Sequence, residues 1–304
     1  IALQSNLLAD PVNWTLVHTP LHFLILSFVT RLIEDTNLLR LLFCIFSVTL
    51  PVIFYFIITG LNNNKKYQEN LIILACCIFF IPSFRYTSIW ANNLITSLVF
   101  FSISIYFYKK WEVSKTKYLD KNVLFQIFFL ILATYTRQYF AVFFIYFLYQ
   151  YYKELKLKSF LKLFSLCVLS SIPVFLYVYK FPELLTGQKI SVYAMNNFIL
   201  GNTSMMSLTL YPIIFINFFY KNINYRNFLT SSIISFLIVI FLSLNLNTQN
   251  WLGGGANFML SKKIFNNNLY FYFTSFFTIA TSIYLVFEKK ENLILILTLI
   301  FMFF

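Results

Sequence analysis

A long apolar run between two clusters of lysine decides the fold of this chain. Residues 123–152 read VLFQIFFLILATYTRQYFAVFFIYFLYQYY, and lysines flank them on both sides. At 1.5 Å per residue the run makes about 45 Å of helix, too long for one straight span and too short for two full ones. A single crossing would separate the two lysine clusters, which the positive-inside rule disfavours. We therefore predict a hairpin of two short helices that turns at Arg137.

Composition indicates that lipid surrounds most of the chain. Of the 304 residues, 60% are hydrophobic and only 11% are charged, and the mean hydropathy is +0.75. A soluble globular chain carries about a quarter charged residues, so a water-facing surface is excluded. The same figures exclude a disordered tail, a disulfide-rich secreted module and a coiled coil. The predicted fold class is all-α: a polytopic transmembrane helix bundle with an interfacial helix and a short two-helix hairpin.

The order of apolar runs and basic residues predicts a single membrane domain over residues 1–304. The apolar runs lie at about 39–59, 71–88, 90–108, 123–152, 161–180, 207–220, 228–246, 268–287 and 292–304. Most of the 23 Lys and Arg residues fall in alternate separators, which are therefore expected to be cytoplasmic. This division puts residues 1–38 outside, as a loop and an interfacial helix, and residues 39–304 in the bundle. The basic residues do not line one patch, so no nucleic-acid partner is expected.

Residues 20–34 are predicted to form a helix that lies in the membrane plane. Their apolar stretch makes about 22 Å of helix, shorter than a hydrocarbon core of about 30 Å. Its polar members recur at helical spacing: Ser27, Thr30, Arg31 and Glu34. We expect these side chains to form one wet stripe on an interfacial helix.

The predicted external side offers few groups for acid–base chemistry. Its carboxylates are Asp10, Glu34, Asp35 and Glu183. Asp10 is the candidate catalytic carboxylate, with an ordinary turn residue as the alternative. His18 and His22 are four residues apart, but Pro20 makes the helix begin between them, so a shared metal ion is not expected. Each histidine either binds a polar ligand or anchors the segment at the interface.

Basic side chains on the external side are candidates for binding a phosphate. Arg85 lies near the external end of the run at 71–88, and Arg137 lies at the tip of the predicted hairpin. An arginine at membrane depth is costly unless it faces a protein interior or a water-filled cavity. The alternative is that both side chains snorkel to the interface. Lys262 and Lys263 form a further external basic pair after Gly253–Gly255. The sequence implies no metal ion and no cofactor.

One stretch resembles a known enzyme family. Residues 17–48 read VHTPLHFLILSFVTRLIEDTNLLRLLFCIFSV and resemble the segment after the first external loop of GT-C integral membrane glycosyltransferases, in particular the dolichyl-phosphate-mannose protein mannosyltransferase and aminoarabinose transferase type. The matching residues are His18, Pro20, Leu21, Leu39, Arg40 and Leu41. Further on, residues 81–86 resemble the proline-then-Arg-aromatic span end of that family, and Tyr135-Thr136 resembles its hairpin apex.

The resemblance implies a reaction and its partners. It implies transfer of a sugar from a polyprenyl-phosphate donor to a lipid, glycan or protein acceptor at the external face of a bacterial inner membrane. An external carboxylate would deprotonate the acceptor and basic side chains would stabilise the departing phosphate. The signature acid of the family is expected upstream of Ile1, because we expect the chain to be truncated at both ends. The alternatives are a transporter, a flippase or an O-antigen-polymerase-like protein for lipid-linked glycans, and a membrane scaffold.

Overall fold

The computed structural model describes the chain as a set of helices. The described residues are 21–33, 35–61, 68–80, 82–89, 92–114, 116–180, 200, 203, 224–243 and 269–288. These residues contain helices and no strand, which confirms the all-α class. The chain divides into two compact units, Ile1–Gly187 and Gln188–Phe304, and each is described by itself. The expectation of a single membrane domain stays a prediction.

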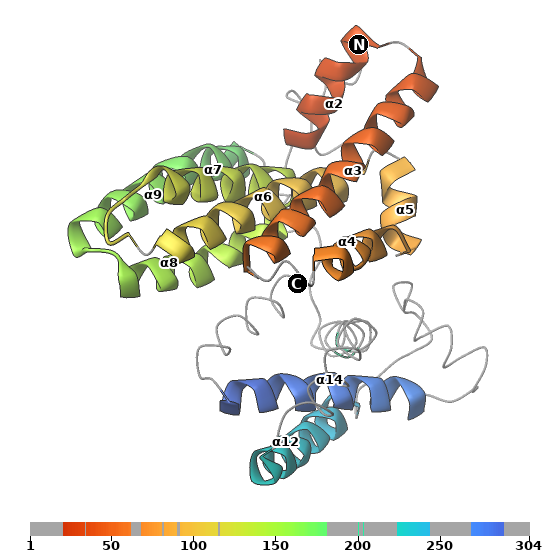
Figure 1. Ribbon diagram of the computed structural model, residues 1–304, viewed down its shortest axis with the longest axis vertical. Helices are drawn as coiled ribbons and strands as arrows, with labels where there is room; N and C mark the ends of the chain where they lie inside the picture. Colours follow the sequence, from red (N-terminus) through yellow and green to blue (C-terminus); the bar gives the residue numbers. More distant parts are fainter. Residues whose placement is uncertain are drawn as a thin grey trace. The chain divides into compact units, whose positions relative to one another are not determined.

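The first unit carries most of the described helices (Figure 1). They are α2 (Leu21–Leu32), α3 (Thr36–Leu61), α4 (Gln68–Cys76), the 3-10 helix η3 (Cys77–Phe80), α5 (Pro82–Ile89), α6 (Asn93–Ser114), α7 (Lys121–Thr136), the 3-10 helix η4 (Gln138–Val142), α8 (Phe143–Glu154) and α9 (Leu157–Lys180). The second unit has α12 (Tyr225–Ser243) and α14 (Leu269–Glu288).

Helices α6 and α7 are antiparallel neighbours. Their contacts join residues in opposite order: Phe100 with Phe129, Ser104 with Gln126, and Phe107 with Phe125. Helix α8 runs in the direction of α6, since its ring contacts join residues in the same order: Phe101 with Phe143, Tyr108 with Phe147, and Trp111 with Tyr151. Helices α7 and α8 are therefore antiparallel to each other.

The predicted hairpin is confirmed, and its turn falls where the sequence placed it. Helix α7 ends at Thr136, and Arg137 follows with an extended backbone at φ −147° and ψ 116°. At the other end, the Asp120 carboxylate accepts a hydrogen bond from the backbone N–H of Val123 at 3.0 Å and caps the start of α7. The backbone N–H of Lys156 donates to the carbonyl of Lys117 at 3.0 Å. Both lysine clusters therefore lie at the same end of the hairpin.

We call this end of the first unit the lysine end. It holds Lys109, Lys110, Lys117, Lys121, Lys153, Lys156, Lys158 and Lys162, at the close of α6 and α8 and at the start of α7 and α9. The opposite end, where α6 begins and α7 closes, is called the polar end. Helix α3 also closes at the lysine end, because Phe56 and Gly60 border one groove with Lys109 and Lys110. The excess of lysine at one end is the distribution expected of helices sorted by the positive-inside rule.

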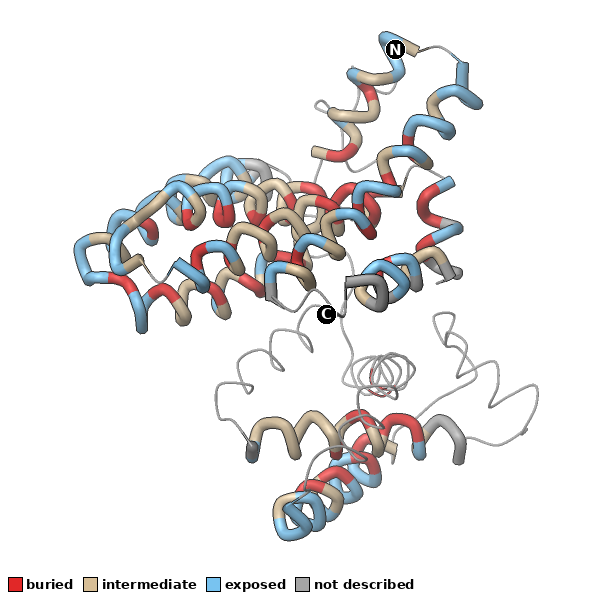
Figure 2. The backbone as a smooth tube through the Cα atoms, in the orientation of Figure 1, coloured by how far each residue is buried: buried red, intermediate tan, exposed pale blue. Residues whose placement is uncertain are grey.

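The described helices have both buried and exposed faces (Figure 2), and they bury polar side chains as well as apolar ones while many large apolar side chains are exposed. Ser104 and Gln126 are fully buried, while Phe28, Leu169 and Phe175 are 64%, 64% and 71% exposed. Three described helices are long and apolar enough to cross a bilayer, within Thr36–Gly60, Leu157–Leu176 and Tyr225–Ser243. Exposed apolar side chains together with buried polar ones suit helices that are surrounded by lipid.

The apolar run at 71–88 does not form one helix. It is divided among α4, η3 and α5, and α5 starts at Pro82. Nine and eight residues make about 13 Å and 12 Å of helix, so neither helix spans a bilayer alone. An apolar run of this length need not be one helix, since Pro82 lacks the N–H that a continuing helix needs. The break lets Phe84 of α5 pack with Leu50 of α3 and with Ile95 and Val99 of α6 in a small core.

Helix α2 forms inside the stretch predicted to be interfacial, but not all of its polar residues are exposed as the prediction required. His22 and Ser27 are buried, and α2 contacts α6 and α7. Leu24, Phe28 and Leu32 are exposed at a spacing of four residues, so they form an apolar outer stripe. Ser27 is therefore not part of a wet stripe, because packing against α6 and α7 turns it inward. Thr30 and Arg31 are exposed as predicted.

In the second unit, α12 and α14 form an antiparallel pair. The Phe228 and Tyr284 rings are 6.3 Å apart, and the Ser235 hydroxyl donates to the Phe276 carbonyl at 2.8 Å. The Ser275 hydroxyl donates to the carbonyl of Leu200 at 2.9 Å. One serine hydroxyl thus links α12 to α14 and another links α14 to Leu200, as small hydroxyl side chains do in many membrane proteins.

Candidate functional site

The polar end of the first unit gathers buried polar side chains from three helices. Extending the α6–α7 register by two turns from the Phe100–Phe129 pair places Asn93 opposite Thr136. Asn93 and Thr136 are both buried. Helix α2 contacts both α6 and α7, and His22 of α2 lies within hydrogen-bond distance of Thr96 of α6, so His22 belongs to the same group. We call His22, Asn93, Thr96, Thr136 and Arg137 the polar-end cluster.

His22 joins α2 to α6. Its Nδ1 lies 3.1 Å from the Thr96 hydroxyl, and its side chain is only 2% exposed. The Phe23 and Phe43 rings lie edge-on to the imidazole at centroid distances of 5.6 Å and 6.0 Å. A histidine so enclosed positions the helix, and a ligand would reach it only if α2 moved.

Arg137 is the cation of the polar-end cluster. It is half-buried, and its guanidinium lies 5.4 Å from the centroid of the Tyr139 ring. Its Nε is buried and has no hydrogen-bond acceptor among the described residues. The extended backbone at the turn ends α7 and directs the chain into η4. A guanidinium with a buried donor left over can bind an anion through its planar fork.

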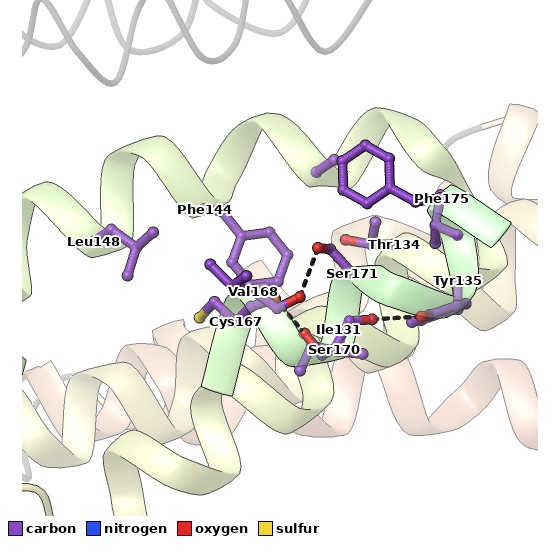
Figure 3. A pocket seen from close by; sticks show the side chains of 12 residues that line it. Ile131, Thr134, Tyr135, Phe144, Leu148, Cys167, Val168, Ser170, Ser171 and Phe175 are labelled. Atoms are coloured by element: carbon purple, nitrogen blue, oxygen red, sulfur yellow. Dashed lines mark hydrogen bonds between the residues drawn. The ribbon is translucent and has the colours of Figure 1, made fainter. Parts of the chain in front are cut away.

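An apolar groove lies beside this turn, between α7, α8 and α9 (Figure 3). Its volume is about 310 Å³, and its lining includes Thr134 and Tyr135 before Arg137 and Ala141 after it. The Tyr135 hydroxyl donates to the Ser170 carbonyl, which ties the end of α7 to α9. The remaining walls are mainly aliphatic and aromatic, so the groove suits a hydrocarbon chain.

The structure separates the predicted site residues. His22 lies beside Thr96 of α6, Arg137 lies beside Tyr139 at the turn after α7, and Arg85 lies on α5 with its side chain exposed. Asp10, His18, Lys262 and Lys263 lie outside the described residues.

Among the four predicted external carboxylates, Asp35 is the described one. It is exposed, and its side chain accepts a hydrogen bond from the backbone N–H of Asn37 at 2.8 Å, at the start of α3. This is a helix-capping role. Asp10, Glu34 and Glu183 lie outside the described residues. Within the described ranges, no three His, Cys, Asp or Glu side chains come together as a metal site would require.

A second group of buried polar side chains was not predicted from the sequence. Gln126 is fully buried, and its Nε2 donates to the Ser104 hydroxyl at 3.1 Å. The Tyr151 hydroxyl donates to Gln126 Oε1 at 3.2 Å. One side chain therefore joins α6, α7 and α8. The signal in the sequence is the single amide among residues 123–136, a residue type that lipid-facing positions disfavour.

Comparisons with known proteins add no further guide to the site. No family model, no curated protein and no solved structure matches this chain.

Proposed function

We propose that this protein is a membrane glycosyltransferase that moves a sugar from a polyprenyl-phosphate donor to an acceptor at the external face. The observation that carries the proposal is the position of Arg137 at the turn of the hairpin. Its buried Nε has no hydrogen-bond acceptor among the described residues, and Arg137 lies in the sequence between Tyr135 and Ala141, which both line the apolar groove. A polyprenyl-phosphate sugar has a hydrocarbon chain next to an anion, which matches an apolar groove next to a cationic side chain. The resemblance of residues 17–48 to GT-C enzymes supports the same substrate class.

The lysine end would face the cytoplasm, so the polar end would face outward. This orientation suits a bacterial inner membrane in which the donor presents its sugar at the outer surface. The groove between α7, α8 and α9 would hold the part of the polyprenyl chain nearest the phosphate. Arg137 would bind the phosphate, and His22 would hold α2 in place beside it.

In the proposed reaction, a carboxylate takes the proton of an acceptor hydroxyl, and the hydroxyl oxygen bonds to the anomeric carbon of the sugar. The bond between that carbon and the phosphate oxygen breaks, and its electron pair leaves on the phosphate. Arg137 stabilises the charge that develops there. Asp10 is the candidate carboxylate within the sequence, and His18, Arg85, Lys262 and Lys263 are further candidates for contacts with the phosphate.

Release of the polyprenyl phosphate tests the proposal. The purified protein is reconstituted in liposomes with radiolabelled polyprenyl-phosphate sugars and a panel of lipid, glycan and peptide acceptors. We expect cleavage of the sugar–phosphate bond by the wild type and a large loss in Arg137→Gln. Lys158→Gln, which removes an exposed charge at the lysine end, is the matched control and should be unchanged. Movement of the intact donor across the bilayer without cleavage would instead identify a flippase.

A further inference from the structure

A second groove lies at the lysine end, far along the helices from the polar-end cluster. It is bordered by the closing turns of α3 and α6 and has a volume of about 410 Å³. Its borders combine Phe56, Ile57 and Gly60 of α3 with Tyr106, Lys109 and Lys110 of α6. We call it the lysine groove. The proposed glycosyl transfer makes no use of it.

Two lysines give the lysine groove its charge. Lys110 is exposed, and its Nζ lies 4.5 Å from the centroid of the Tyr106 ring. Lys109 forms an ion pair with Glu112, whose side chain is 45% exposed. An exposed pair of this kind is weak, so a second anion can compete for Lys109. Both lysines border the groove, and an ammonium group is a point charge that suits a phosphate.

The rest of the lysine groove is apolar and open. Phe56 is 52% exposed and Val113 is 73% exposed. Gly60 has no side chain, and a Cβ placed there would meet nothing within 4 Å. A free phosphate would leave these apolar walls uncovered, whereas an amphiphile would cover them and neutralise the lysines together.

The apolar surface continues along α3 away from the lysines. Phe56 also lines a groove of about 230 Å³ between α3 and α4, together with Val48 and Val52. From Gly60 to Val48 is about 18 Å along the helix. A hydrocarbon chain whose head lies at Lys109 and Lys110 thus has a continuous apolar path toward the middle of α3.

We propose that the lysine groove binds an anionic phospholipid from the leaflet that surrounds the lysine end. The lipid phosphate contacts Lys109 and Lys110, and one acyl chain lies against Phe56 and along α3. The occupant is a bilayer lipid because both of its parts have a matching wall, and the α3 face that carries the chain is itself exposed at Val48 and Val52. Basic pockets between membrane helices on the lysine-rich side are known to bind anionic lipid headgroups.

Lipid titration of the purified, delipidated protein tests this proposal by native mass spectrometry. Phosphatidylglycerol and phosphatidylcholine with the same acyl chains are compared, since both carry a phosphate but only the first has a net charge. We expect a lower apparent Kd for phosphatidylglycerol. In Lys109→Gln/Lys110→Gln this Kd should rise by about 30-fold, near fivefold for each lysine. The matched control Lys158→Gln/Lys162→Gln removes two exposed charges from α9 and should stay within about twofold of the wild type.

Two further variants change the groove without removing lysine. Gly60→Leu keeps every charge and fills the open space, so the Kd should rise by about 10-fold, the loss expected when two methylene contacts are displaced. Glu112→Gln frees Lys109 from its ion pair, so the Kd should fall by about threefold. Size-exclusion profiles establish that each variant is folded. Equal Kd values for the groove variants and the α9 control, or equal affinity for the two lipids, would overturn the proposal.

Discussion

Gln126 is expected to hold three helices together, and removing its amide should weaken the first unit more than any exposed substitution. Its amide nitrogen donates to Ser104 at 3.1 Å and its amide oxygen accepts from Tyr151 at 3.2 Å, and all three side chains are fully buried. Leucine at this position is close in volume but makes neither bond. Gln126→Leu therefore isolates the two hydrogen bonds from packing.

The expected change in the free energy of unfolding follows from the hydrogen bonds that each substitution removes. Hydrogen bonds between membrane helices contribute about 0.6 kcal/mol on average and up to about 1.7 kcal/mol each. Gln126→Leu also leaves the buried Tyr151 hydroxyl without this acceptor, so we expect the free energy of unfolding to fall by about 2–3 kcal/mol. Tyr151→Phe removes one bond and should lower it by about 1 kcal/mol. The double variant Gln126→Leu/Tyr151→Phe should cost less than the sum by about 1 kcal/mol, because no unpaired tyrosine hydroxyl remains.

Unfolding of the purified protein in mixed micelles, driven by added SDS and followed by far-UV circular dichroism, measures these differences. Ser165→Ala is the control, since Ser165 is exposed on α9 and bonds to the Leu161 carbonyl of its own helix. Its free energy of unfolding should stay within about 0.5 kcal/mol of the wild type. A Gln126→Leu protein as stable as the control, or additive single costs, would refute the argument that this amide couples the helices.

Three other predictions concern topology, the phosphate and α2. Cysteine labelling in a background without native thiols should find Lys156→Cys and Ser204→Cys on opposite sides of the membrane, and outside labelling of Lys156→Cys would contradict the assigned orientation of the hairpin. Arg137→Lys keeps the charge but loses the planar fork, so sugar transfer should fall about 30-fold to 10³-fold with little change in unfolding; equal turnover would remove Arg137 from the site. His22→Ala should lower the free energy of unfolding by about 2 kcal/mol through the lost packing and the lost bond to Thr96, measured by the same SDS titration. A His22→Ala protein of wild-type stability would show that α2 does not depend on this contact.

The sequence by itself determined the features that depend on one-dimensional order. The scarcity of charge indicated membrane helices because lipid cannot solvate charged side chains. The two lysine clusters around residues 123–152 predicted the hairpin because each crossing of a bilayer reverses the side, and Lys117 and Lys156 do meet at one end. The turn at Arg137 followed from the length of the run. Such features need no knowledge of which helix contacts which.

Only the tertiary structure decided which polar residues face one another. Helical spacing grouped Ser27 with Thr30 and Arg31, but packing against α6 and α7 buries Ser27. The register of α6 against α7 brings Asn93 to the closing turn of α7, beside Arg137, and puts Gln126 within reach of Ser104. These pairings join residues far apart in the sequence through side-chain packing. A periodic pattern within one helix shows that a face exists, whereas the partner of that face depends on how the neighbouring helices fill the space around it.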